Sequence, residues 1–291
     1  MKRDELRALM ARAGIRPRRT AGQNFLVEEN LADAIARDGG IEPGDVTLEI
    51  GTGFGILTSR LAARAHHVVG VELDPRVAAV ARELLADAEN LTLLEADALA
   101  SKNALAPEMV ELVRARLAAA PGRLRVVANL PYNVATPLVV LLLGERWPLA
   151  SITVMVQLEA AERFAAQPGD EAYGAVSVLC RAQTESVEVV RKVPRDVFMP
   201  RPKVTSAVVR LIPSEGRHQG LAELAAVTRA LFNYRRKTLS KAAKAVARRH
   251  PELDWIGGAI GEAALDPGLR VEDLGVQELR SLAEIGAKKR N

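Results

Sequence analysis

The residues Asn129-Leu130-Pro131-Tyr132 could hold the amino group of a planar base. They follow the apolar run 124–128, so they stand at the end of a predicted strand. The side-chain oxygen of Asn129 and nearby main-chain carbonyls can accept N–H bonds, and the Tyr132 ring can stack on the face of a base. The same residue types also suit an ordinary strand-to-helix turn, so the motif alone leaves both interpretations open.

Three earlier strand ends carry groups that suit a nucleoside ligand. The predicted buried strand 46–50 leads into Gly51-Thr52-Gly53-Phe54-Gly55 and then into a helical pattern. A second strand, 67–71, ends in Glu72, and a third apolar run leads to Asp97. In an open α/β sheet, strand ends of this kind face one crevice in which ligands bind.

These groups favour S-adenosylmethionine over a nicotinamide dinucleotide. The dinucleotide fingerprint G-x-G-x-x-G needs a third glycine where this chain has Ile56. A carboxylate such as Glu72 can accept both hydroxyls of a ribose, and Asp97 can accept the amino group of an adenine. Either acid alone also fits a solvated loop, but the two together with the glycine loop indicate an S-adenosylmethionine site.

Composition limits the other classes of site. The chain has 291 residues, of which 48% are hydrophobic, enough for a well-buried core and about two domains. We find no apolar run near the length of a membrane span and no secretory signal pattern. The single Cys180 excludes an intramolecular disulfide and a cysteine-rich zinc site, and the four histidines lack metal-ligand spacing. We therefore expect a cytoplasmic protein without a metal ion.

Basic residues concentrate in two segments. Residues 1–22 carry a net charge of +5 and residues 235–250 a net charge of +7, although the whole chain carries only +4. Such clusters predict a surface for a polyanion such as RNA, and two solvated helix faces are the alternative. The predicted RNA-binding residues are Arg16, Arg18, Arg19, Arg235, Arg236, Lys237, Lys241, Arg248 and Arg249.

The pattern along the chain predicts an α/β body followed by helices. We expect a basic helical N-terminal segment at 1–43, a catalytic domain at 44–213 and a helical RNA-docking domain at 214–291. The segment 174–193 fits neither the helical nor the strand period. Breaks in the C-terminal helices are predicted near Pro251, Gly257-Gly258 and Pro267-Gly268.

Five motifs in the same order resemble the rRNA adenine N6-dimethyltransferase family. They are Gly22-Gln23-Asn24-Phe25-Leu26, Glu49-Ile50-Gly51-x-Gly53-x-Gly55, Asn129-Leu130-Pro131-Tyr132, Phe198-x-Pro200-x-Pro202-Lys203-Val204-x-Ser206 and Phe232-Asn233-Tyr234-Arg235-Arg236-Lys237-Thr238-Leu239. The resemblance covers nearly the whole chain. It implies a class I S-adenosylmethionine-dependent methyltransferase fold, with a Rossmann-like, mostly parallel sheet and a small C-terminal all-α domain.

The resemblance is strongest to the bacterial small-subunit enzymes, and it also implies a substrate and a site. The implied activity is dimethylation of two adjacent adenosines in the 3′-terminal hairpin loop of small-subunit (16S) rRNA, coupled to ribosome biogenesis, by a monomer. The implied cofactor-binding residues are Asn24, Leu26, Gly51, Gly53, Glu72, Leu73, Asp97, Ala98 and Asn129. The implied catalytic residues are Asn129, Leu130, Pro131, Tyr132 and Phe198, with Tyr132 and Phe198 on either side of the target base. Leu158 departs from the family, because a lysine is expected there.

Three other functions stay open at this point. A large-subunit rRNA methyltransferase of the antibiotic-resistance type is the nearest, but the helical region after residue 220 favours the small-subunit kind. A non-catalytic RNA-binding factor on the same fold is disfavoured by intact Glu72, Asp97 and Asn129. A nicotinamide-dependent oxidoreductase is disfavoured by Ile56 in the glycine loop.

Overall fold

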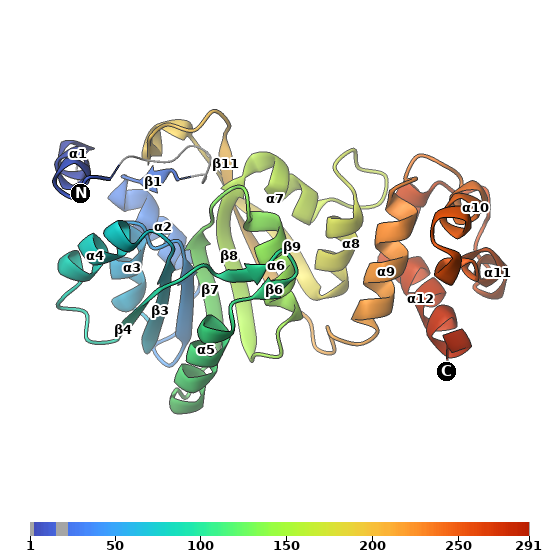
Figure 1. Cartoon of the computed structure of the whole chain (residues 1–291), viewed down its shortest axis with the longest axis horizontal. Helices are drawn as coiled ribbons and strands as arrows, with labels where there is room; N and C mark the ends of the chain where they lie inside the picture. Colours follow the sequence, from blue (N-terminus) through green and yellow to red (C-terminus); the bar gives the residue numbers. More distant parts are fainter. Residues whose placement is uncertain (1–2, 16–22, 291) are drawn as a thin grey trace. The chain divides into compact units, whose positions relative to one another are not determined.

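Apolar strands form the centre of the fold (Figure 1). The computed structural model describes residues 3–15 and 23–290. Their seven-stranded sheet has the order β4-β3-β2-β7-β8-β11-β9. Its strands are β2 (Val46–Ile50), β3 (His67–Glu72), β4 (Leu91–Glu95), β7 (Leu124–Asn129), β8 (Leu149–Gln157), β9 (Thr184–Val193) and β11 (Ser206–Pro213). The strands β4, β3, β2, β7 and β8 pair in parallel, and β11 pairs antiparallel with β8. The expected mostly parallel methyltransferase-type sheet is confirmed.

Helices flank the parallel strands in chain order. They are α1 (Arg3–Arg12), α2 (Glu29–Asp38), α3 (Ile56–Ala62), α4 (Pro75–Leu84), α5 (Pro107–Ala119), α6 (Ala135–Gly144) and α7 (Leu158–Ala165). Two of them begin at a proline, which has a suitable φ and no N–H to leave unpaired at a first helical position. The α4 helix is capped by Asp74, whose carboxylate accepts a hydrogen bond of 3.1 Å from the Arg76 main-chain N–H.

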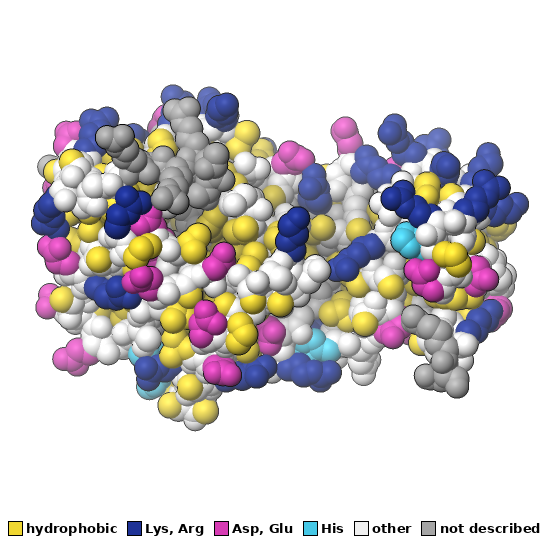
Figure 2. Space-filling model, viewed as in Figure 1, with side chains coloured by type: hydrophobic (Ala, Val, Ile, Leu, Met, Phe, Trp, Pro, Cys, Tyr) yellow, Lys and Arg dark blue, Asp and Glu magenta, His cyan; other side chains and the backbone are white. Residues whose placement is uncertain are grey.

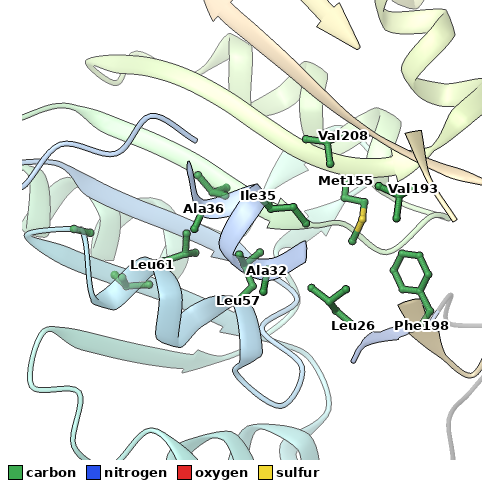
Figure 3. Packing of buried hydrophobic residues seen from close by; sticks show 13 residues of the cluster. Leu26, Ala32, Ile35, Ala36, Leu57, Leu61, Met155, Val193, Phe198 and Val208 are labelled. Atoms are coloured by element: carbon green, nitrogen blue, oxygen red, sulfur yellow. The ribbon is translucent and has the colours of Figure 1, made fainter. Parts of the chain in front are cut away.

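A hydrophobic cluster joins the helical layer to the sheet and to a short strand pair (Figure 3). The helices α2 and α3 contribute Ile35 and Leu61, and β8 contributes Met155. The pair consists of β1 (Phe25–Leu26) and β10 (Phe198–Met199), which are antiparallel with Leu26 opposite Phe198. This pairing holds β1 beside the glycine loop, where the Phe25 ring also meets the Phe54 ring edge to face, with their centroids 4.7 Å apart.

The chain divides into two compact units, residues 1–161 with 188–213 and residues 162–187 with 214–291. The second unit contains α8 (Ala175–Ala182), α9 (Leu221–Phe232), α10 (Leu239–Arg249), α11 (Ile256–Glu262) and α12 (Val276–Arg290). Tyr173 is fully buried within it, donates a hydrogen bond of 2.9 Å to the Leu274 carbonyl and meets the Phe232 ring edge to face. The expected helical C-terminal region is confirmed, whereas the expected boundaries near residues 44 and 214 stay predictions.

Some local expectations differ from the structure. The ambiguous segment 174–193 resolves into α8 followed by β9. The predicted breaks near Pro251 and Pro267-Gly268 are confirmed, because α10 ends at Arg249 and α11 at Glu262. The predicted break near Gly257-Gly258 is wrong, because both glycines lie inside α11, whose buried Ile256 and Ile260 supply packing that outweighs low helix propensity. The hairpin of β5 (Leu99–Ser101) and β6 (Ala104–Leu105), which follows Asp97, is not among the predicted elements. Within the described residues, no helix is long and apolar enough to cross a membrane.

A carboxyl group lies inside the central strand β2. Every residue of this strand is buried, and Glu49 is only 1% exposed. Its Oε2 atom has no hydrogen-bond partner among the described residues. Burial raises the pKa of Glu49 to about 8, and the nearby charge of Glu72 acts in the same direction. Glu49 is therefore mostly neutral at pH 7 in the ligand-free protein.

Glu49 predicts that the stability of the ligand-free protein falls with rising pH. The folded chain holds a proton that the unfolded chain has lost, so the free energy of unfolding decreases from about pH 5 to about pH 8. The Glu49→Gln variant cannot ionise at this position and should lack this part of the decrease. Across this pH interval, the melting temperature of Glu49→Gln should rise relative to that of the wild type. A constant difference between the two melting temperatures would contradict the assigned pKa.

Candidate functional site

One cavity collects the groups predicted at the strand ends. Its lining includes all of the expected cofactor-binding residues, Asn24, Leu26, Gly51, Gly53, Glu72, Leu73, Asp97, Ala98 and Asn129, together with Leu130, Pro131 and Tyr132. The strands β2 and β7 are neighbours although β3 and β4 lie between them in the sequence. The cavity therefore lies where the strand order reverses, which is the usual ligand position in open α/β sheets.

The glycine loop after β2 leaves room for a ligand against its main chain. Gly51 has a φ of 80° and Gly55 a φ of 83°, conformations that strain residues with a side chain. A Cβ atom on Gly55 would lie 2.6 Å from Leu85 Cδ1. A Cβ atom on Gly51 would lie 3.6 Å from the Asn129 carbonyl oxygen, between the ends of β2 and β7. The absence of a side chain at Gly51 keeps this space open.

Glu72 holds the glycine loop from the end of β3. Its Oε2 accepts a hydrogen bond of 2.9 Å from the Gly53 N–H, and its Oε1 accepts one of 3.0 Å from the Asp74 N–H. The side chain is 7% exposed, and burial raises its pKa although both hydrogen bonds oppose the shift. Each carboxylate oxygen has a second acceptor position, so Glu72 can also accept the hydroxyls of a ribose.

The end of β4 suits a flat ligand that has polar groups at its edge. The exposed Asp97 accepts a hydrogen bond of 2.9 Å from the Leu99 N–H through Oδ1, and no described residue donates to its Oδ2. Ala98 is buried, and its carbonyl accepts from the Ala106 N–H at the base of the β5–β6 hairpin. Leu73 is 60% exposed and gives the same region an apolar surface. An adenine could pack on Leu73 while its amino group donates to Asp97.

The side chain of Asn129 has a defined orientation at the end of β7. Its Nδ2 atom donates a hydrogen bond of 3.2 Å to the Asn24 carbonyl, which comes from the segment before β1. None of the described residues donates to Oδ1. The following turn is attached to β8, because the Leu130 N–H donates to the Met155 carbonyl at 3.1 Å. Asn129 thus presents a hydrogen-bond acceptor in the cavity wall.

The two predicted stacking rings are not brought together. Tyr132 lines the cavity and its hydroxyl lies 2.5 Å from the Ser206 Oγ. Phe198 is 0% exposed and does not line the cavity, since its ring packs with Leu26 and Val193 in the core (Figure 3). The expected sandwich of a base by both rings is therefore absent from this conformation of the described residues.

The predicted RNA-binding residues have different environments. Arg16, Arg18 and Arg19 lie outside the described residues. Arg235 donates hydrogen bonds of 3.2 Å to the carbonyls of Glu171 and Tyr173, so it supports the fold of the second unit. The exposed cations of this segment are Arg236, Lys237, Lys241, Lys244, Arg248 and Arg249. Figure 2 shows Lys and Arg side chains gathered over α10 and the adjacent C-terminal helices.

Several cavity residues had no predicted role. Glu49 and Phe54 line the cavity from within the glycine-loop motif, and Gln23 and Phe25 line it from the motif that contains β1. The glycine-loop spacing pointed to Glu49 only as a strand residue, and its burial depends on pairing with two other strands. Ser206 belongs to a family motif, but its contact with Tyr132 joins residues 74 apart in the sequence.

Comparison with known proteins agrees with this geometry. The sequence model of the family described as ribosomal RNA adenine dimethylase matches residues 15–257. A ribosomal RNA small subunit methyltransferase A from Moorella thermoacetica is 40% identical, with 95% of this chain and 94% of that protein covered.

Two solved structures are also similar to the chain. A dimethyladenosine transferase from Plasmodium falciparum has 26% identity and a TM-score of 0.77, over 91% of this chain and 98% of that one. The 23S rRNA methyltransferase ErmE has 26% identity and a TM-score of 0.63, over 90% and 98%. The chain thus belongs to the ribosomal RNA adenine dimethylase family: it is an rRNA adenine dimethyltransferase, and its cofactor is S-adenosylmethionine.

Proposed function

We propose that this enzyme dimethylates the N6 atoms of two adjacent adenosines in the 3′-terminal hairpin loop of small-subunit (16S) rRNA. We further propose that it acts as a metal-independent monomer in the cytoplasm during small-subunit biogenesis. The names of the nearly full-length relatives support the choice of RNA. The observation that carries the chemistry is the Asn129 carboxamide, whose Nδ2 is held by the Asn24 carbonyl while Oδ1 is available as an acceptor.

Asn129 and Leu130 activate the target amine in this proposal. The lone pair of an adenine amino group is delocalised into the ring, so the amine is a poor nucleophile. Acceptance of its two N–H bonds by Asn129 Oδ1 and the Leu130 carbonyl favours a pyramidal nitrogen with a directed lone pair. When bound, S-adenosylmethionine supplies an electrophilic methyl group. Alignment of two bound reactants can contribute roughly 7–11 kcal/mol. No general base is needed before transfer, because the methylated ammonium product is itself acidic.

Tyr132 provides the stacking surface for the flipped base. It lines the same cavity as Asn129 and lies three residues further along the turn. Removing the base from its loop stack costs about a few kcal/mol, which stacking on an aromatic ring offsets. Phe198 takes part only if β10 moves its ring out of the core cluster.

The first test maps the product by mass after incubation with labelled cofactor and undermethylated rRNA of both subunits. Methyl groups on neighbouring adenosines of the small-subunit RNA are expected.

Asn129→Ala should lower single-turnover methylation on the order of 10²-fold, as removal of one transition-state hydrogen-bond partner does, with RNA affinity little changed. Asn103→Ala, on the exposed hairpin tip, is the control. Methylation of large-subunit RNA alone would overturn the substrate, and an unchanged rate would overturn the role of Asn129.

The second test concerns the ribose. Glu72→Ala removes the acceptor at the end of β3 and also frees the Gly53 N–H, so it should weaken S-adenosylmethionine binding by at least about tenfold in isothermal titration. Glu95→Ala removes an acid at the end of the adjacent strand that does not line the cavity, and should bind normally. Equal affinities for the two variants would exclude Glu72 from the cofactor site.

The exposed face of α10 is the best-defined part of the proposed RNA surface. Lys241, Lys244 and Arg248 are spaced three and four residues apart, so they share one face, and Arg249 is exposed beside them. The opposite face buries Leu239 and Val246. Such a face suits the phosphate groups of an RNA.

The third test measures RNA binding by this face as a function of salt. Each phosphate contact changes the log–log salt slope by about −0.9, so replacing Arg248 and Arg249 with Ala should flatten the slope by up to about two units. RNA affinity should fall, while cofactor affinity stays the same. The matched control removes two exposed charges from other helices of the second unit, Arg229 and Lys288. An unchanged slope in a filter-binding series would show that α10 is only a solvated face.

A further inference from the structure

The hydroxyl groups of Tyr132 and Ser206 form a hydrogen bond at the edge of the cavity. Their oxygen atoms lie 2.5 Å apart. Ser206 is 0% exposed and stands at the start of β11, where it pairs with Gln157 of β8. Tyr132 belongs to the turn after β7 and is partly buried. The bond therefore connects the turn that carries the proposed stacking ring to a strand on the other side of β8.

This bond fixes the far end of the ring. The near end is already held, because the Leu130 N–H donates to the Met155 carbonyl and the Val134 N–H donates to the Pro131 carbonyl, both at 3.1 Å. A ring attached only through its Cβ atom can rotate about two side-chain bonds. A ring that is also held at its hydroxyl has one position. A stacking surface with one position loses less freedom when a base arrives, and preorganisation of this kind lowers the cost of alignment.

We infer that Ser206 is a positioning residue for methyl transfer: its hydroxyl holds the Tyr132 ring in the orientation that receives the target adenine. The inference rests on the proposed function, in which Tyr132 stacks on that base. It accounts for a tyrosine at this position, because a phenylalanine would supply the same ring face without the anchor. It also assigns a role to a polar side chain that is fully buried at the start of β11.

A purely structural role for Ser206 makes a different prediction. If the serine only satisfied a buried phenol, Ser206→Ala would destabilise the protein by leaving the Tyr132 hydroxyl without a partner. Tyr132→Phe would do the same to the serine. The double variant contains neither hydroxyl, so its stability should recover in either case. Only the positioning role predicts that the rate of methyl transfer does not recover with it.

The experiment measures melting temperature, cofactor affinity and single-turnover methylation of small-subunit rRNA for the wild type, both single variants and the double variant. Each single variant should lose about 3- to 10-fold in rate, the range expected for one hydrogen bond, at unchanged cofactor affinity. The double variant should regain the melting temperature yet keep the reduced rate. Ser206→Thr, which retains the hydroxyl, should keep most of the rate.

Two results would overturn the inference. One is a wild-type rate in Ser206→Ala, and the other is a rate that recovers together with the melting temperature in the double variant. The Tyr132→Ala variant separates this outcome from failure of the proposed function. If methylation by the wild type occurs and Tyr132→Ala abolishes it while the hydroxyl variants do not differ, the stacking role stands and only the anchor is wrong. If Tyr132→Ala retains the wild-type rate, the stacking role itself is wrong.

Discussion

The parallel pairing of β2 with β7 is the constraint on which the site depends. The register places Val46 opposite Leu124 and Leu48 opposite Val126. At the amino ends of these strands, the Asp45 carboxylate accepts a hydrogen bond from the Arg123 main-chain N–H and another from the Arg125 side chain. The pairing continues to Leu48 and Val126, and because both strands stay extended beyond it, the register set at one end also sets the positions of the residues at the other. The glycine loop and Asn129 therefore emerge side by side.

Much of this arrangement follows from local sequence patterns. The buried strands and the acids after β3 and β4 each have a short-range signal, and the topology of parallel sheets brings the strand ends together. Features that depend on contacts between residues far apart in the sequence are harder to predict from local patterns. Phe198 lies in a two-residue strand whose partner, β1, is about 170 positions earlier, and only that pairing turns its ring into the core. Glu49 looks like an ordinary strand residue in the sequence, because its burial depends on the central place of β2 in the sheet, between β3 and β7.

Charge patterns gave the location of the basic surface but not the task of each residue. A count of positive charges treats Arg235 and Arg248 alike. In the structure Arg235 is half-buried and bonded to main-chain carbonyls, whereas Arg248 is exposed on the polar face of α10. A guanidinium group has several donors and satisfies carbonyl groups as readily as phosphates, so the local supply of acceptors decides its use. That supply is a property of the folded unit, which linear charge density does not contain.

The bond from Asn129 to the Asn24 carbonyl makes the chemistry of β7 depend on the N-terminal segment. A carboxamide has nearly the same shape after a half-turn about its last bond, but the turn exchanges an acceptor for a donor. Sterics alone hardly distinguish these two states, whereas a carbonyl oxygen beside Nδ2 does, because it repels Oδ1. The segment that carries Asn24 is itself held by the two residues of β1. Detachment of that short strand would leave the seven-stranded sheet in place, yet it would take Asn24 and Leu26 out of the cavity wall. With Asn24 would go the polarity that suits Asn129 to its proposed role as a receptor for an amine.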